Sequence, residues 1–152
     1  MQTTIKTQLI NQFTALFANA NATRLFFAPG RVNLIGEHTD YNGGNVFPCA
    51  LDIGTYALVR ARTDKLCRFY SINFPQQGVI EFDLDNLEFN SQHNWSNYPK
   101  GVMTEFIKAG AELTHGFEIV FFGNIPNGAG LSSSASIEVL MGTILNSYFG
   151  CN

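Results

Sequence analysis

The sequence predicts an α+β domain. Short apolar segments with strand character dominate the first half of the chain, and helical segments interleave with strands in the second half. Hydrophobic residues make up 45% of the 152 residues and charged residues only 14%. This composition is typical of a chain that builds a core and not of a disordered one, and the length is that of one domain.

The N-terminal segment 3–18 is predicted to be an amphipathic helix, because Ile5, Leu9 and Phe13 recur at helical spacing. The apolar segments that follow are bounded by Gly, Pro and Asn turn signals and predict strands. They cover residues 24–28 (with a continuation over 32–34 after a kink), 46–49, 53–61, 67–72 and 79–82. Thr63-Asp64-Lys65 is typical of a hairpin turn, so the strand at 67–72 is expected to return against its predecessor.

The second half is predicted to contain a helix over 99–113, with Pro99 in its first turn, and a strand over 117–122. A glycine-containing loop then leads into a last helix over 132–149 that is apolar on most sides, and no Lys or Arg follows Lys108. Such a helix is normally covered on most sides. We therefore expect an exposed apolar stripe of Leu140, Ile144, Leu145 and Tyr148, and a chain that is the incomplete first part of a longer protein and poorly soluble alone.

Charge and cysteine content bear on partners and compartment. The net charge of −3 supplies no basic field for nucleic acid or an anionic membrane, and no apolar run is long enough for a membrane span. Cys49, Cys67 and Cys151 form an odd, scattered set, and the N-terminus lacks an apolar signal segment. These features predict a cytoplasmic protein with reduced thiols.

Residues 30–41 read GRVNLIGEHTDY and concentrate Arg31, Glu37, His38 and Asp40 between glycines. Two carboxylates with an imidazole between them suit the hydroxyls of a small polyol. A solvated loop with incidental charges is one alternative. A metal site is another, but the spacing matches none of the usual zinc patterns.

Residues 126–135 read PNGAGLSSSA and lie between a predicted strand and a predicted helix. Backbone N–H groups freed by glycines, together with the positive end of a helix, make an anion site, and serine hydroxyls add donors. The loop is not a Walker A sequence, because no G-K-[ST] follows. The alternative is a serine N-cap after a glycine turn.

Together the two segments resemble the GHMP kinase superfamily, and the first resembles the signature of the galactokinase family. The resemblance implies the GHMP kinase N-terminal domain (ribosomal protein S5 domain 2-like) over residues 1–152. A galactose-binding signature region would occupy 19–50 and an ATP phosphate loop 124–136.

The resemblance also implies roles for individual residues. Glu37, His38, Thr39 and Asp40 would bind galactose, and Arg31 would stabilise charge in the transition state. The phosphates of ATP would be held by a run of seven residues, namely Gly128, Ala129, Gly130, Leu131, Ser132, Ser133 and Ser134. Ser134 would also bind Mg²⁺. Ser71 and Trp95 would form the wall of the nucleotide pocket. For Trp95, a place in the apolar core at the start of a helix is an equally weighted alternative.

The implied activity is ATP-dependent phosphorylation of galactose at its anomeric hydroxyl by a monomeric enzyme. In that family the aspartate base and a second magnesium ligand lie beyond the phosphate-loop helix, so we expect residues 1–152 alone to be inactive. Two alternatives remain, a GHMP kinase for another small alcohol and a sensor of the same fold that binds galactose and ATP without turnover.

Overall fold

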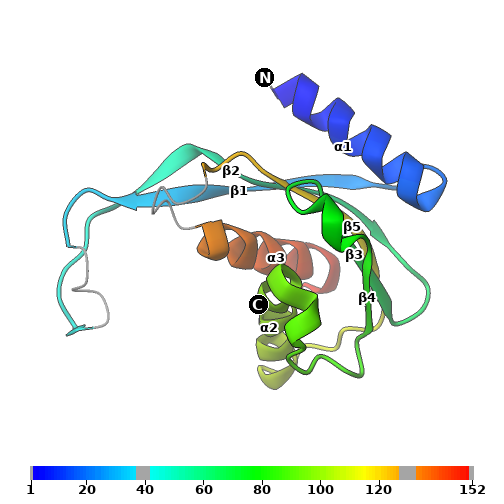
Figure 1. Cartoon of the computed structure of the whole chain (residues 1–152). Coiled ribbons are helices and arrows are strands. Elements are labelled where there is room, and N and C mark those ends of the chain that lie inside the picture. The colour runs from blue at the N-terminus through cyan, green and yellow to red at the C-terminus, as the bar shows by residue number, and fades with distance from the viewer. Residues whose placement is uncertain (1, 37–41, 127–132, 151–152) are drawn as a thin grey trace.

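The computed structural model describes residues 2–36, 42–126 and 133–150. In these ranges a five-stranded sheet has the order β1-β2-β5-β3-β4, with α1 on one face and α2 and α3 on the other (Figure 1). The helices are α1 (Gln2–Phe17), α2 (Asn97–Lys108) and α3 (Ser133–Phe149), with short 3-10 helices η2 (Pro75–Gln77) and η3 (Ser91–Ser96). The strands are β1 (Arg24–Asn33), β2 (Pro48–Ala61), β3 (Leu66–Ser71), β4 (Ile80–Asp83) and β5 (Phe117–Gly123).

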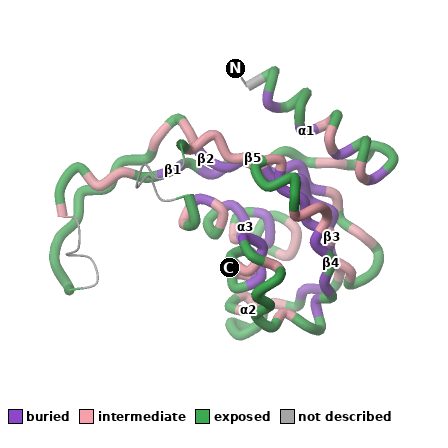
Figure 2. Tube along the Cα trace, in the orientation of Figure 1, coloured by how far each residue is buried: buried purple, intermediate pink, exposed green. Residues whose placement is uncertain are grey.

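Helix α1 packs through the face that its apolar spacing predicts. Ile5, Leu9 and Phe13 are buried, and they meet β-strand residues such as Leu58 and Val120 in a core of their own. The larger core lies on the other face of the sheet, between the strands and helices α2 and α3. The sheet therefore separates two apolar cores, and Figure 2 shows its central strands as the most buried part of the chain.

Strands β1 and β2 are longer than the sequence indicates. The interruption at Pro29-Gly30 is a register shift inside one continuous β1, because Pro29 pairs with Gly54 whereas Arg31 pairs with Ala50. Likewise the end of the predicted strand 46–49 and the whole predicted strand 53–61 belong to one strand, β2, which begins at Pro48. The β1–β2 ribbon extends beyond the other strands, and Figure 2 shows much of that extension as exposed. Backbone pairing across the ribbon outweighs the local turn signals.

Strand β5 occupies the centre of the sheet and corrects the predicted hairpin. It pairs antiparallel with β2 and parallel with β3, so β2 and β3 are not neighbours although they follow each other in the chain. The turn-like sequence at 63–65 therefore connects β2 to β3 across the intervening strand β5. Strand β3 is hydrogen bonded to β5 and β4 and not to β2.

Helix α2 is shorter than predicted and is preceded by a 3-10 helix. It ends at Lys108, and Gly110 then adopts a positive φ of 95°, a conformation that glycine reaches without the cost imposed by a side chain. Trp95, expected near the helix start, belongs to η3. The apolar residues at 111 and 113 pack on the core from a non-helical segment.

Helix α3 contradicts the expected exposed stripe. Leu140, Ile144 and Leu145 are fully buried against the sheet and α2, and Tyr148 is partly buried. The strongly exposed apolar residue of the helix is Val139, at 58%. The sheet and α2 therefore cover the helix, and the apolarity of α3 does not by itself indicate missing chain. None of the helices in the described ranges combines the length and apolarity that crossing a bilayer requires.

A buried ionic cluster on the α1 face joins three strands. The Glu118 carboxylate of β5 accepts hydrogen bonds from Arg60 of β2 at 2.6 Å, from Arg68 of β3 at 3.2 Å and from Arg62, next to β2, at 2.9 Å. Arg60 also donates to the carbonyl oxygens of Phe17 and Asn19 at the end of α1. The cluster fixes α1 to the central strands.

We predict that Glu118→Gln lowers the free energy of unfolding by about 2–3 kcal/mol, because charge-assisted hydrogen bonds from three guanidinium groups are lost at a buried position. The matched control is Glu81→Gln, which removes one half-exposed pair with Arg68 and should cost less than about 1 kcal/mol. Urea unfolding measures both variants. Equal losses in the two variants would contradict a special role for the cluster.

Candidate functional site

A cavity of about 300 Å³ lies where the C-terminal ends of β3 and β5 and the middle of β2 meet the start of α3 and the η3–α2 segment. Its walls include Thr55 of β2, Ser71 of β3 and Phe121 of β5. Segment η3 contributes Asn94 and Trp95, and α2 contributes Tyr98. Helix α3 contributes Ser133, Ser134 and Ile137. The remaining described lining residues are Asn73, Phe74, Gly123 and Ile125. Segments that lie as far apart in sequence as Thr55 and Ile137 thus form one site.

Four of the residues predicted for nucleotide binding meet at this cavity. Ser71, Trp95, Ser133 and Ser134 all line it, although the sequence places them in three separate segments. Arg31 does not line it and lies exposed on β1. The predicted sugar-binding residues Glu37, His38, Thr39 and Asp40 lie outside the described residues. So do the phosphate-loop residues Gly128, Ala129, Gly130, Leu131 and Ser132.

Two asparagines fix the point at which the chain leaves β5 toward the predicted phosphate loop. The Asn73 side chain accepts from the Gly123 amide at 2.7 Å and donates to the Gly123 carbonyl oxygen at 2.8 Å. The Gly54 backbone N–H donates to Asn124 Oδ1 at 2.8 Å, and the Asn124 backbone N–H donates to the Gly54 carbonyl oxygen at 3.1 Å. The exit of β5 is therefore held from both neighbouring strands.

A third polar anchor holds the first turns of α3. The buried Ser136 hydroxyl is hydrogen bonded to the Ala28 carbonyl oxygen and to the Thr55 hydroxyl, each at 2.9 Å. Asn73, Thr55 and Ser136 were not predicted as site residues. Their sequence signal is only that of polar residues near strand and helix ends, which many loops share.

The electrostatics of the cavity favour an anion. No acidic residue lies in the first turn of α3, and none of the described lining residues carries a charge at neutral pH. The first N–H groups of a helix lack intrahelical acceptors, and its dipole is positive at that end. The hydroxyls of Ser133 and Ser134 lie at this same end. A phosphate group matches these donors.

Trp95 is a core aromatic that also lines the cavity, and its predicted contact with a nucleotide stays a prediction. It is 6% exposed and packs edge-on against Phe121 at 5.3 Å between ring centroids, as a core aromatic does. It also lines the cavity, and within the described residues its buried Nε1 has no hydrogen-bond acceptor. A buried donor of this kind fits a ligand that supplies an acceptor.

A buried lysine supports the segment that carries Trp95. Lys100 of α2 is 2% exposed, and its ammonium donates to the Glu88 carbonyl oxygen and to His93 Nδ1, at 3.1 Å from the latter. The ammonium also lies 5.3 Å from the centre of the Phe82 ring. Burial lowers the pKa of Lys100. Burial, with the neighbouring ammonium as the smaller cause, lowers the pKa of His93.

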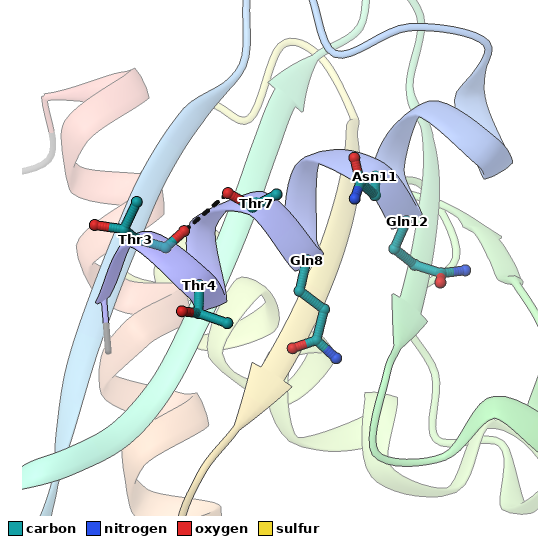
Figure 3. Close-up of a pocket in the computed structure, with 6 residues that line it drawn as sticks. All are labelled: Thr3, Thr4, Thr7, Gln8, Asn11 and Gln12. Atoms are coloured by element: carbon teal, nitrogen blue, oxygen red, sulfur yellow. Dashed lines mark hydrogen bonds between the residues drawn. The ribbon is translucent and has the colours of Figure 1, made fainter.

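Two further hollows lack the predicted site residues. One of about 860 Å³ lies between the ends of α2 and α3. The other, of about 620 Å³, is a shallow groove along α1 (Figure 3), lined by the uncharged polar residues Thr3, Thr4, Thr7, Gln8, Asn11 and Gln12. Its one drawn hydrogen bond runs from the Thr7 hydroxyl to the Thr3 carbonyl oxygen, within the helix. The 300 Å³ cavity is therefore the candidate site.

Comparison with known proteins agrees with this architecture. The galactokinase galactose-binding signature matches residues 11–61, and the GHMP kinases N terminal domain matches residues 97–152. The structure is similar to that of Lactococcus lactis galactokinase complexed with galactose, with a TM-score of 0.93 and 49% identity over 97% of this chain and 38% of that one. Methanococcus jannaschii mevalonate kinase shares the fold, with a TM-score of 0.71 at 18% identity over 87% of this chain and 42% of that one.

The fold and the matched domain define the N-terminal domain of a GHMP kinase. Galactokinases from Clostridium beijerinckii and Bacillus subtilis are 64% and 59% identical to the chain over 95% of its length. The chain belongs to the galactokinase family. It spans 37% of the length of each of these two relatives.

We predict that the stability of the domain falls as the pH drops below about 6.5, through His93. Its pKa in the folded chain lies below the unfolded value of 6.5, so the unfolded chain binds more protons in this range. The contribution is therefore complete above that pH and is lost on acidification. Unfolding measured between about pH 5 and 7.5 should show a steeper loss for the wild type than for His93→Gln, which does not titrate. An imidazole NMR titration of His93 with a midpoint at or above 6.5 would contradict the assignment.

Proposed function

We propose that this chain forms the galactose- and ATP-binding N-terminal domain of an enzyme that converts galactose and ATP to galactose 1-phosphate and ADP. One observation carries the proposal. A galactokinase galactose-binding signature over residues 11–61 is part of the same domain as a cavity lined by Ser71, Trp95, Ser133 and Ser134. A sugar signature and an uncharged cavity at a helix start suit the two substrates of a sugar kinase.

The chemistry is phosphoryl transfer to the anomeric hydroxyl of the sugar. The bond between the γ-phosphorus and the β,γ-bridging oxygen breaks, and a bond from phosphorus to the sugar oxygen forms. The proton of that hydroxyl passes to a base, which the family resemblance places beyond residue 152. This chain would supply the phosphate cradle at 128–134, the sugar contacts at 37–40, and Arg31 to neutralise the transferred group.

The described residues fit magnesium only in part. Ser134 offers a hydroxyl oxygen at the cavity, but no carboxylate is among the described lining residues. Mg²⁺ prefers several oxygen ligands and often takes them from the phosphates of a nucleotide. When bound, it supplies charge neutralisation between the β- and γ-phosphates. Ser134 would be the residue of this chain that contacts it.

The proposal can be tested by replacing the matched region of Clostridium beijerinckii galactokinase with this chain. Release of ADP by the chimera that depends on galactose and yields galactose 1-phosphate is the expected result. Turnover with another small alcohol but not with galactose would favour a different GHMP kinase. Binding of galactose and ATP without turnover, while the parent enzyme is active, would favour a sensor.

In the active chimera we predict that Asp40→Asn raises KM for galactose roughly ten- to a hundredfold and leaves KM for ATP unchanged. A sugar hydroxyl would lose its charged acceptor, which costs about 1–3 kcal/mol. Asp85→Asn, at an exposed pair with Lys65, is the matched control and should leave both constants unchanged. A selective rise in KM for ATP would show that Asp40 does not bind the sugar.

We further predict that Gly130→Val weakens binding of Mg-ATP by this chain more than about a hundredfold. A branched side chain hinders the approach of phosphate to the backbone amides, and two charge-assisted hydrogen bonds account for a factor of this size. Trp95 is the single tryptophan of the chain, so its fluorescence reports directly on the cavity. Gly101→Val is the control, because a Cβ there meets no atom within 4 Å. Unchanged affinity in Gly130→Val would remove the phosphate-loop assignment.

A further inference from the structure

The wall of the cavity contains a strained residue. Asn94 has φ 42° and ψ −117° inside η3, in a backbone region that residues with side chains rarely adopt. It lines the cavity together with Trp95, the next residue in the chain. Strain of this kind persists where the surrounding structure enforces it, and it is concentrated at functional sites. Contacts with neighbouring residues must therefore hold Asn94 in this conformation.

The side-chain amide of Asn97 makes three hydrogen bonds that close the loop around Asn94. Its Nδ2 donates to the carbonyl oxygens of Asn90 at 2.7 Å and of Asn94 at 3.0 Å, and its Oδ1 accepts from the Asn90 amide at 3.1 Å. One amide thus satisfies both backbone groups of Asn90 and holds the carbonyl of the strained residue. Both ends of the kink are tied to the first turn of α2.

Two further contacts hold the same loop from inside the domain. The fully buried Ser96 hydroxyl donates to the His93 carbonyl oxygen at 2.8 Å. The Lys100 ammonium reaches the His93 ring and the Glu88 carbonyl oxygen, which lie on the two sides of Asn90 in the chain. None of the ion pairs among the described residues includes Lys100. Its buried charge is instead stabilised by groups of the loop itself.

We propose that Asn97, supported by the His93–Lys100 contact, is a positioning residue for the nucleotide pocket. By holding Asn94 in its strained conformation, Asn97 keeps the Trp95 ring and Tyr98 in the cavity wall before any ligand arrives. The assignment of the ligand rests on the proposed function, whereas the positioning of Trp95 stands on the geometry. Preorganisation of this kind strengthens binding because the ligand need not select a minor loop conformation.

The test uses Asn97→Asp in the full 152-residue chain, which keeps the volume and one acceptor oxygen but removes both donated hydrogen bonds. Gln92→Glu is the matched control, because it makes the same amide-to-acid change in the same loop. Gln92 enters the hydrogen bonds of the described residues only through its backbone amide. Two quantities are measured on folded protein, checked by circular dichroism. They are acrylamide quenching of Trp95 without ligand and the dissociation constant of Mg-ATP.

We expect Asn97→Asp to raise the quenching constant roughly twofold or more and to weaken Mg-ATP binding roughly tenfold, with neither change in Gln92→Glu. A folded Asn97→Asp variant with wild-type quenching would overturn the proposal, since a merely structural role lowers the melting temperature without exposing Trp95. Raised quenching with unchanged affinity would overturn the link to the nucleotide pocket.

Two other results are informative. If the wild-type chain shows no binding of Mg-ATP, the proposed function fails and with it the nucleotide part of this inference, and quenching alone then decides the positioning role. If Asn97→Asp does not fold, His93→Ala replaces it. That variant removes the ring that accepts from Lys100 at a partly exposed position, and it should raise quenching in the same direction. Unchanged quenching in folded His93→Ala would then overturn the proposal.

Discussion

The structure depends on the placement of β5 between β2 and β3. This strand is paired on both edges and buried on both faces, with Val120 toward α1 and Ile119 and Phe121 toward α2 and α3. Its Glu118 gathers arginines from both sides. Because β5 is held in this way, its C-terminal end is a fixed point. The chain leaves that point toward the predicted phosphate loop, and α3 returns beneath the sheet.

Side-chain hydrogen bonds hold the end of β5 and the start of α3 at the candidate site. Asn73 and Asn124 hold the chain where it leaves β5, and Ser136 holds α3 where it resumes. The buried hydroxyls of Thr55 and Ser136, which were not predicted as site residues, hold the start of α3 against β2 beside the cavity.

The cavity wall formed by η3 and the start of α2 is likewise held in place by hydrogen bonds. Trp95 packs in the core and also lines the cavity, so its orientation matters to both. The segment that holds it is irregular and contains a strained residue, yet it is tied by side-chain hydrogen bonds and by a buried lysine. Irregular backbone can be rigid when each polar group has a partner. The cavity is thus bounded by ordered chain on both of its described sides.

Periodicity and motif composition are local properties of a chain, so they are enough to predict the α+β class, the apolar face of α1 and the chemical character of residues 30–41 and 126–135. The separation of β2 from β3 by β5 follows from the fold, since strand partners are chosen by hydrogen bonds between distant segments. The coverage of Leu140 and Ile144 also follows from the fold, because burial depends on what packs against a helix and not on its own composition. For the same reason the sequence could name Ser71, Trp95 and Ser134 as candidates, but only the fold brings them to one cavity.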